Sequence, residues 1–591
     1  MKRITVFSLI CVLLALCALS FFGCDSSTLV EGSRGAKDYS GDSSVLTDNE
    51  SSNLSMARIF ANGMVLQREE PINIYGYATT GSTVTVTLGE NSTSAVAADG
   101  EWRVTLPAME ATRGLTLTVE SADRRLSFVD VSIGEVFVVS GQSNAQYFAC
   151  QLEDWDEIAR LAETLDNIKV YAETSTWDMH PSDYGYGTWI KATRANLEAD
   201  GPVKGNVSAV GYVMATKLAA ELGPDVDVAL INVCRSGTKI TAWFPAEELY
   251  KDPTTHADDI ARYEDYLAFW DANGRWPQST AESKYYQSGN PYSYIPTLSY
   301  NAMIAPIKGY TARAVIWYQG ESDAGISSVY TGKFGVLREL YSNAFANDDI
   351  PFFVVQLAPY NTDVNTLATM EAVQYDLTVK YPNTYVVSTG VDGSPINMMD
   401  MLYGAPPQVI HPSRKSPLGY RTADRVLVEL FGRSDEILTA PRLTKIEKGE
   451  GIVTLTFDTA LRLLRGVTPE DFQVYDSATS SWVKVSAVIS GNTVVLDTSA
   501  LTAPTQVRYG FGGRFIELAT GELIRLNVDS RFTLNIDENG VRYAEYIDTD
   551  VSPSRVFTFY SEDGQIIRTI KSGNLTNASG EPMPTFVVSI P

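Results

Sequence analysis

Between residues 133 and 432, short apolar runs alternate with segments that have the length of helices. Five of these runs carry few polar side chains: residues 136–140, 226–233, 314–318, 352–357 and 384–388. Strands that are buried on both faces give continuous apolar runs, and parallel strands need helical connections between them. The pattern therefore predicts a doubly wound α/β domain, in which helices cover both faces of a parallel sheet.

The segment 207–222 has the clearest helical period of this region. Four apolar residues fall on one face of it: Val207, Val210, Met214 and Leu218. Asn206 or Ser208 stands near its start, where such side chains cap helices. In doubly wound sheets the ligand crevice lies beyond the carboxyl ends of the strands, so we expect the chemistry of the protein there.

Short runs with alternating polarity flank this region on both sides. They lie at residues 72–76, 82–88 and 102–106, and again at 452–457, 493–496 and 507–510. A period of two in short runs predicts antiparallel sandwiches. With 591 residues the chain is too long for a single core. We predict four folded regions: an N-terminal β-sandwich at 56–131, the α/β domain at 132–435, a second sandwich at 436–535, and an additional β region at 536–591.

The first 24 residues have the pattern of an export signal. Lys2 and Arg3 precede the apolar stretch 4–22, and Gly23-Cys24 follows it. A small residue before Cys resembles the lipobox of bacterial lipoproteins, which predicts a lipid anchor at Cys24, although Phe21 stands where an aliphatic residue is usual. An uncleaved anchor, a periplasmic protein or plain secretion are the alternatives. Residues 25–55 are rich in Ser, Gly and Asp and predict a flexible spacer.

Composition and charge narrow the class of protein. The chain is 44% hydrophobic and 20% charged, which is ordinary for a globular protein. Its net charge of -25 would repel phosphate backbones, so we do not expect nucleic acid as a partner. Outside the signal only Cys150 and Cys234 remain, too few for a disulfide framework. One bridge between them is possible, but two buried thiols are the preferred interpretation.

The first apolar run of the α/β region leads into Gly141-Gln-Ser-Asn144, and a helix-compatible segment follows. A free serine hydroxyl is a poor nucleophile. It becomes a useful one at a strand tip, beside a base and backbone N–H donors. Ser143 is therefore the candidate nucleophile.

The chain has three histidines, and imidazole is the usual base for a serine nucleophile. His411 lies in a proline-bounded loop before the last helix of the α/β region, where the chain can return to the crevice. His256 stands among polar, loop-like residues and is expected at the surface. His180 lies in an aromatic loop that can border a cleft. We predict His411 as the base.

Three motifs of this chain resemble signatures of one known family. They are Gly141-Gln-Ser-Asn144, Trp317-Tyr-Gln-Gly-Glu-Ser322 and Ile410-His-Pro412, which are similar to those of the sialate O-acetylesterase family, a branch of the SGNH hydrolases. Further likeness lies at 62–67, 208–212 and 300–306, in the same order and approximate spacing. The resemblance implies an SGNH-type, flavodoxin-like sheet and a carbohydrate O-acetylesterase that works through an acyl-enzyme. It implies Ser143 as nucleophile, His411 as general base, and no metal or organic cofactor.

Stabilising the oxyanion of such a reaction needs preorganised donors. The candidates are the backbone N–H groups of Ser143 and Gly237 and the side-chain amide of Gln319. Gly237 is equally well explained as an ordinary turn glycine. The alternative for Gln319 is a residue that braces its loop.

Two positions depart from the family pattern. Gln408 stands where SGNH enzymes commonly have the Asp that orients the histidine. A neutral amide or a backbone carbonyl of the same loop could orient the ring instead, the enzyme could work with a Ser–His dyad, or Asp392 could serve from another loop. Arg235 replaces a tryptophan before the presumed oxyanion glycine. It can pair with a substrate carboxylate, such as that of a sialic acid, or form a structural bridge to Asp or Glu.

Glu321 and Asp323 form a carboxylate pair that invites a metal or glycosidase interpretation. Without a supporting histidine cluster they make a poor metal site. We therefore expect Glu321 to hold its loop by hydrogen bonds, and we also consider it a substrate-binding candidate. Aromatic residues in 174–188 and 263–295 are expected to line a sugar platform or to pack in the core.

The predicted function is thus an exported carbohydrate O-acetylesterase, with an acetylated sugar or glycan as its partner and sialate as the preferred substrate. A xylan or pectin acetylesterase is the alternative within this class. A glycan-binding lipoprotein that has lost its catalysis, which Gln408 would permit, is the alternative from another class.

Overall fold

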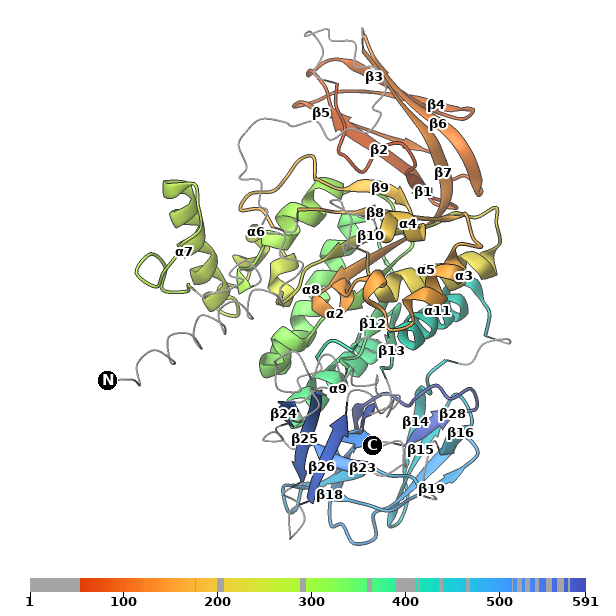
Figure 1. Cartoon of the computed structure of the whole chain (residues 1–591), viewed down its shortest axis with the longest axis vertical. Helices are drawn as coiled ribbons and strands as arrows, with labels where there is room; N and C mark the ends of the chain where they lie inside the picture. The colour runs from red at the N-terminus through yellow and green to blue at the C-terminus, as the bar shows by residue number, and fades with distance from the viewer. Residues whose placement is uncertain are drawn as a thin grey trace.

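A computed structural model of the protein describes residues 54–122, 124–175, 177–198, 207–286, 294–358, 364–389, 410–412, 415–434, 439–463, 468–512, 514–517, 523–526, 532–536, 542–548, 555–560, 568–571 and 574–591. Three tiers follow one another along the longest axis of the molecule (Figure 1). A β-structure from the N-terminal part lies at one end, an α/β layer in the middle, and a second β-structure at the other end. The predicted signal 1–24, with Cys24, and nearly all of the spacer lie outside the described residues.

The N-terminal tier is built mainly from antiparallel pairs. Its strands are β1 (Val65–Gln67), β2 (Ile72–Tyr77), β3 (Thr83–Leu88), β4 (Asn91–Val96), β5 (Glu101–Leu106), β6 (Thr112–Ser121) and β7 (Arg124–Gly141). The first strand, β1, pairs in parallel with β7. β2 pairs with β5, and β3 pairs with β4 and β6, as the alternating runs predict. β7 pairs with β6 at its start and continues into the α/β layer. The predicted boundary at residue 131 therefore falls inside one strand.

The central sheet is parallel around β7. Its other strands are β8 (Ile168–Ala172), β9 (Thr188–Lys191), β10 (Val228–Cys234), β11 (Ala314–Tyr318), β12 (Phe352–Val355) and β13 (Thr384–Val387). The order is β13-β12-β11-β7-β10-β8-β9, and only the edge strand β9 in this order is antiparallel. All five predicted runs are strands of this sheet, whereas β8 and β9 were not predicted.

The flavodoxin-like detail of the prediction differs from this order. A flavodoxin-like sheet places its first strand between the second and the third. Here β10, the third parallel strand, separates β7 from β8, because β8 takes the outer position and β9 folds back on it. The chain winds to one side of β7 first and then crosses to β11 on the other side. The carboxyl end of β7 thus lies at the point where the winding changes direction.

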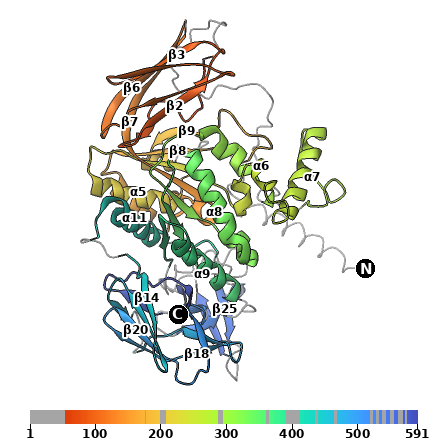
Figure 2. The same ribbon diagram turned by 180° about the vertical axis from the view of Figure 1, so that it is seen from behind.

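Helices cover both faces of this sheet (Figures 1 and 2). The α-helices among the described residues are α2 (Ser143–Gln146), α3 (Trp155–Ala162), α4 (Arg194–Glu198), α5 (Ala209–Leu222), α6 (Ala246–Leu249), α7 (Ala257–Asn273), α8 (Ser327–Ala344), α9 (Val364–Lys380) and α11 (Ser416–Phe431). Alternate residues of each strand point to opposite faces. Val136 and Val138 therefore pack with α8 and α9, whereas Phe137 and Val139 pack with α3, α5 and α11.

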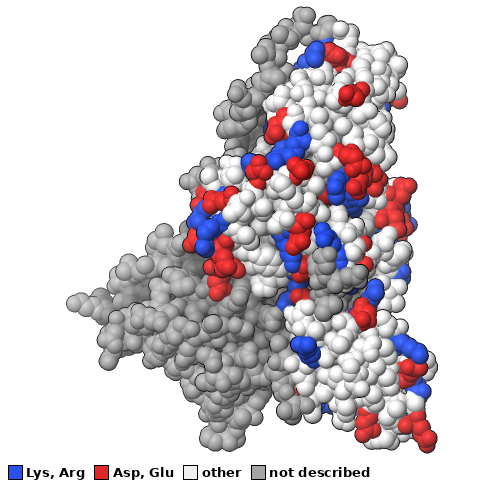
Figure 3. Space-filling view, turned by 90° about the vertical axis from the view of Figure 1, so that its right-hand side faces the viewer, with Lys and Arg blue, Asp and Glu red and all other residues white. Residues whose placement is uncertain are grey.

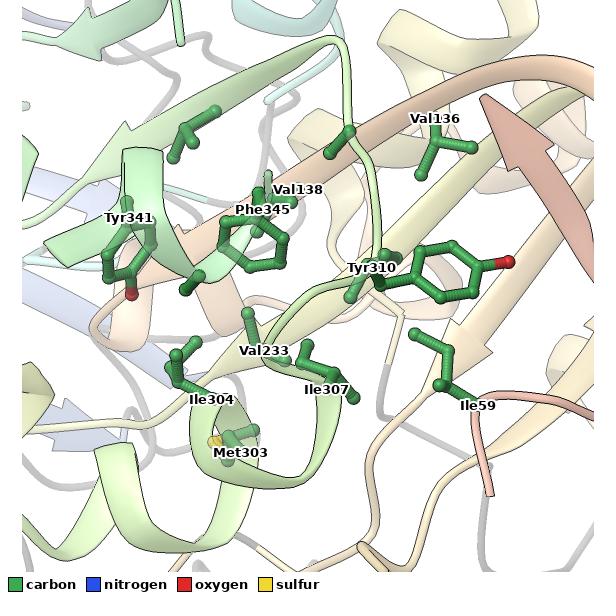
Figure 4. Packing of buried hydrophobic residues seen from close by; sticks show 14 of the residues in the cluster. Ile59, Val136, Val138, Val233, Met303, Ile304, Ile307, Tyr310, Tyr341 and Phe345 are labelled. Carbon is green, nitrogen blue, oxygen red and sulfur yellow. The ribbon is translucent and has the colours of Figure 1, made fainter. Parts of the chain in front are cut away.

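α5 confirms the helix that was expected at 207–222. Its N-cap is Ser208, whose Oγ accepts a hydrogen bond from the N–H of Gly211 at 3.2 Å. On the opposite face, Val138 and Val233 lie close to Phe345, and Val136 lies toward Tyr310 in the same core (Figure 4). This core runs without a break into the N-terminal tier, so the two tiers are packed together around β7.

The C-terminal tier contains two four-stranded antiparallel sheets that share one core. The first contains β14 (Leu443–Lys448), β15 (Ile452–Phe457), β19 (Ala487–Ser490) and β20 (Thr493–Asp497). The second contains β17 (Phe472–Asp476), β18 (Ser481–Lys484), β21 (Pro504–Tyr509) and β29 (Phe586–Ser589). The predicted strands at 452–457, 493–496 and 507–510 correspond to β15, β20 and β21.

The end of the chain returns to this second sandwich. β29 pairs with β21, and β28 (Leu575–Asn577) pairs with β16 (Leu461–Leu463). Two three-stranded antiparallel sheets lie between β21 and β28 in the sequence. They contain β22 (Arg514–Glu517), β23 (Leu523–Leu526), β24 (Phe532–Ile536), β25 (Arg542–Asp548), β26 (Arg555–Tyr560) and β27 (Arg568–Lys571). The second sandwich therefore takes strands from both sides of the predicted boundary at 535.

On the described part of the face shown in Figure 3, acidic and basic side chains are interspersed along the molecule. Within the described ranges, no helix combines the length and the apolarity that a bilayer crossing requires.

Candidate active site

Ser143 stands at the carboxyl end of the central strand. β7 ends at Gly141, and the short helix α2 begins at Ser143, which is half-buried. Gly141 has a φ of 137°, and a Cβ at this position would lie 2.2 Å from the carbonyl oxygen of Tyr318. Only glycine avoids both the backbone strain and the overlap. The turn that presents Ser143 therefore depends on glycine at this position.

Hydrogen bonds join the loops that follow β7, β10 and β11. The N–H of Ser236 donates to Gln146 Oε1 at 2.7 Å, and Ser322 Oγ donates to the carbonyl of Gly237 at 3.1 Å. Gln142 Oε1 accepts from the N–H of Ser322 at 3.2 Å. These bonds fix the turn of Gly237 and the loop after β11 beside the turn of Ser143.

Asn144 connects the loop of His411 to this group. It is fully buried, and its Nδ2 donates to Glu321 Oε1 at 2.6 Å and to the carbonyl oxygen of Ile410 at 2.8 Å. Its Oδ1 accepts from Lys415 Nζ at 2.6 Å. Ser143 precedes Asn144 and His411 follows Ile410. One hydrogen bond thus brings the segments of the two predicted catalytic residues together, across 266 positions of sequence.

The side chain of His411 is exposed at the surface, but the surrounding protein partly desolvates its ring, and this affects the pKa of the ring. This desolvation, followed by the positive charge of Lys415, lowers the pKa of His411 to about 4. The ring is therefore neutral at neutral pH. A neutral imidazole has a free lone pair and can accept a proton from a hydroxyl.

The two oxyanion candidates differ in their surroundings. Gly237 is half-buried in a turn, with a φ of 75°. Gln319 is fully buried, and its Nε2 lies 2.6 Å from Asp323 Oδ2, 3.1 Å from the carbonyl of Thr238 and 3.2 Å from Gln142 Oε1. The amide N–H groups of Gln319 are thus directed at protein acceptors. This arrangement favours the bracing role, and the oxyanion role of Gln319 stays a prediction.

The carboxylate pair serves the loop, as we expected of Glu321. Its Oε1 accepts from Asn144, and burial raises the pKa of Glu321. Asp323 is buried, and its Oδ2 accepts from the N–H of Ile240 at 2.9 Å. Among the residues that the structure describes, no group of three or more His, Cys, Asp or Glu side chains is placed to hold a metal ion.

A family model and several known proteins similar to this chain are described as the same kind of esterase. A family model described as carbohydrate esterase, sialic acid-specific acetylesterase, matches residues 280–401. The sialate O-acetylesterase of Mus musculus is 24% identical over 508 residues, which cover 76% of this chain and 88% of that protein. The Homo sapiens protein of the same name is 26% identical over 434 residues, 67% of this chain and 75% of its own length. Over most of its length the chain thus resembles the sialate O-acetylesterase family.

A solved structure supports the fold of this chain. The crystal structure of a carbohydrate acetylesterase from Xanthomonas citri aligns with 90% of this chain and 99% of its own, at 23% identity and a TM-score of 0.63. The alignment covers all three tiers, because it leaves out only a tenth of the chain. The family resemblance that the three motifs predicted is confirmed.

The other two histidines lie apart from the site. His180 is exposed, with Nε2 at 3.3 Å from Asp271 Oδ1. The prediction of a surface position for His256 is wrong, because this residue is only 5% exposed. Its Nδ1 lies 3.5 Å from Asp259 Oδ2, and its ring packs edge-on against Phe244. The polar residues before it form an exposed turn, and α7 begins directly after it, so His256 is buried although its neighbours in sequence are solvated.

Lys415 is a residue of the site that the sequence did not point to. It precedes α11, is 1% exposed, and lies with Nζ 4.9 Å from the ring centre of Tyr147 and 5.6 Å from that of Tyr318. Burial lowers the pKa of Lys415 to about 7, and the carboxylate of Glu321 opposes that fall. A lone lysine in a polar loop is typical of a surface, so only its position four residues after His411 could have drawn attention to it.

Arg235 follows β10 directly, and its backbone N–H donates to the carbonyl of Gly141 at 2.9 Å. Its backbone therefore lies beside the turn of Ser143. Asp392 and Gln408, the residues considered for orienting His411, lie outside the described residues.

The aromatic candidates divide into two groups. Trp177, Trp270 and Trp276 pack against one another, with ring centres 4.9 to 5.7 Å apart, in a small core beside α7. Tyr184 and Tyr186 are about half exposed, at 49% and 51%. The tryptophans thus have the packing role that was the alternative to a sugar platform.

Cys150 and Cys234 are not bridged. Cys234 is buried, as expected of a buried thiol, whereas Cys150 is partly exposed.

Proposed function

We propose that the protein removes acetyl groups from a sugar through a serine acyl-enzyme, as an SGNH-type carbohydrate O-acetylesterase. The observation that carries the proposal is the hydrogen bond from Asn144 to the carbonyl of Ile410, because it joins the segments of Ser143 and His411 at the tip of the central strand. The family of the chain supports the class of reaction.

In this mechanism the neutral ring of His411 accepts the proton of Ser143 Oγ while that oxygen attacks the acetyl carbon. The backbone N–H groups of Ser143 and Gly237, with Gln319 as a further candidate, would stabilise the oxyanion; one such donor is worth about two to three powers of ten in rate. His411 then gives the proton to the departing sugar hydroxyl. Water attacks the acetyl-serine by the same route, and acetate leaves.

A Ser–His dyad is sufficient for this scheme. It requires neither Asp392 nor Gln408, and a backbone carbonyl can fix the tautomer of the imidazole. The low pKa of His411 keeps the base neutral over a wide pH range, and it also makes the ring a weaker proton acceptor than an ordinary imidazole.

Sialate is the preferred substrate, and Arg235 is the proposed partner of its carboxylate, with Glu321 as a second substrate-binding candidate. The position of Arg235 beside the Ser143 turn and the names of the relatives support this choice. Xylan or pectin acetyl esters are the alternative substrates.

Acetate release from O-acetylated sialic acid and from acetylated xylan separates these substrates. Arg235→Ala should lower kcat/KM for the sialic acid at least about tenfold more than for xylan, because a lost charged hydrogen bond costs about 1.5–3 kcal/mol. Arg194→Ala, which removes a partly exposed arginine that pairs with Asp156 and Glu198, is the control. Equal losses of kcat/KM on both substrates would show that Arg235 does not bind the carboxylate of the sialic acid.

Ser143→Ala and His411→Ala test the catalytic pair itself. Each should abolish acetate release while the melting temperature stays close to that of the wild type. If the wild type turns over neither sugar ester nor an aryl acetate, yet still binds glycans, the non-catalytic glycan-binding lipoprotein is the better description.

We further propose that the protein is exported and anchored by a lipid on Cys24, with a periplasmic or secreted form as the alternative. The charged start, apolar stretch and Gly23-Cys24 support this location, and the net charge of -25 supports a partner other than nucleic acid. Labelling with a radioactive fatty acid should mark the wild type and leave Cys24→Ser unlabelled.

A further inference from the structure

The reaction scheme above gives no role to the ammonium group of Lys415, although it is bonded to Asn144, the residue after Ser143. Lys415 is 1% exposed, and taking such a group out of water costs several kcal/mol unless partners compensate. Its acceptor is Asn144 Oδ1 at 2.6 Å, and two aromatic rings flank it. A buried cation in this place therefore calls for a reason.

The contacts of Asn144 supply one. A lysine ammonium can only donate, so it selects the oxygen of the amide and turns the Nδ2 group toward Glu321 and Ile410. In the opposite orientation, the amide oxygen would face a carboxylate and a carbonyl, and both contacts would be repulsive. Lys415 thus determines which way the Asn144 amide points.

We propose that Lys415 is a positioning residue of the esterase, which fixes the Asn144 amide and thereby holds the segment of His411 against the turn of Ser143. This inference rests on the function proposed above. It adds a residue that touches neither the substrate nor the reacting atoms.

The charges around Lys415 give the inference a second consequence. Among the described residues, Glu321 faces it from the loop after β11 and stabilises its charge, while His411 lies on its own segment and is disfavoured in the charged form. The rings of Tyr147 and Tyr318 complete the surroundings. Lys415 therefore holds the base in place and also helps to keep it unprotonated.

Lys415→Met tests both effects with an aryl acetate as substrate. The kcat should fall about 10- to 100-fold through misplacement of the base, while KM changes less than about threefold. Without the positive charge the pKa of His411 rises, so the acid limb of kcat/KM should move to higher pH. A purely structural lysine would lower activity without moving that limb.

Two further variants control for folding. Lys169→Met removes another buried lysine, which pairs with Asp130 and Asp227 near the amino end of β8, and should leave the pH profile unchanged. Lys415→Arg keeps the charge and should keep the acid limb in its wild-type position. If Lys415→Met does not fold, Lys415→Met/Glu321→Gln, which leaves no unpaired buried charge, takes its place.

The outcomes separate this inference from the function on which it rests. An active wild type, an inactive His411→Ala and a Lys415→Met with wild-type kcat and acid limb would refute the positioning role alone. A wild type without any acetate release would refute the esterase itself. The inference is supported if Lys415→Met has a reduced kcat and an acid limb at higher pH, and if Lys415→Arg returns the acid limb to its wild-type position.

Discussion

Gly141→Ala tests the turn that presents the nucleophile. The added Cβ would lie 2.2 Å from the carbonyl oxygen of Tyr318 and 2.7 Å from its carbonyl carbon, at a φ of 137°. A non-glycine residue held in such a conformation costs about 1–3 kcal/mol. Forcing an atom into packed surroundings costs about another 1–3 kcal/mol, and here the obstacle is the backbone of the neighbouring strand, which cannot rotate away.

The sum is about 2–6 kcal/mol, a large part of the usual stability of a folded domain. The substitution also strains the hydrogen bond from Gln142 N–H to Tyr318 O, which sets the position of Ser143. We therefore expect a lower urea midpoint together with a kcat reduced by at least about tenfold.

Gly332→Ala is the matched control for this variant. Gly332 lies on the exposed face of α8, and an added Cβ meets nothing within 4 Å. It should leave activity unchanged and raise stability by up to about 1 kcal/mol, the helix propensity of alanine over glycine. If Gly141→Ala shows the urea midpoint and the kcat of the wild type, the reasoning about the turn is wrong.

Three further predictions concern pH and the packing between tiers. The kcat/KM should fall to half only at about pH 4, because the pKa of His411 lies that far below its usual 6.5 and the base works when neutral; a midpoint near 6.5 would contradict this. Glu135→Gln should lower stability by about 3–5 kcal/mol in urea unfolding, since it leaves Arg68 and Arg313 without their buried carboxylate; an unchanged midpoint would count against the network. Phe586→Ala should cost about 3–5 kcal/mol through the cavity left in the second sandwich, with kcat unchanged; a loss of kcat at full stability would overturn this expectation.

The fold was largely predictable where burial is uniform. β10, β11, β12, β13 and the part of β7 from Val131 to Gly141 are buried along their length or nearly so, and their apolar runs mark them in the sequence. The sequence pattern did not predict β8, because Lys169 interrupts its apolar run. That lysine is buried in the structure, where Asp130 and Asp227 compensate its charge. Such a long-range ion pair cannot be predicted from the local sequence pattern.

Long-range pairing also explains the other misplaced features. β29 pairs with β21, which lies about eighty residues earlier, so a boundary drawn from local pattern alone fell too early. His256 was expected in solvent because its neighbours are polar, whereas the structure buries it against Phe244 and Asp259.

In the site, too, the residues marked by local sequence were predicted, whereas those that depend on distant partners were not. Ser143 stood out through the strand, turn and helix around it, and His411 through its loop and the family resemblance. Asn144 and Lys415 carry the contacts that join these two segments, but they act through partners up to 271 positions away. A single sequence gives no sign of such long-range partners.

The most direct test of the catalytic pair is covalent labelling by a fluorophosphonate probe, followed by intact mass and peptide mapping. The wild type should gain one adduct, on the peptide that contains Ser143, and Ser143→Ala should gain none. His411→Ala should react at least about 100-fold more slowly, because the hydroxyl has lost its base. An adduct elsewhere, or a labelling rate that does not depend on His411, would contradict the pairing of these two residues.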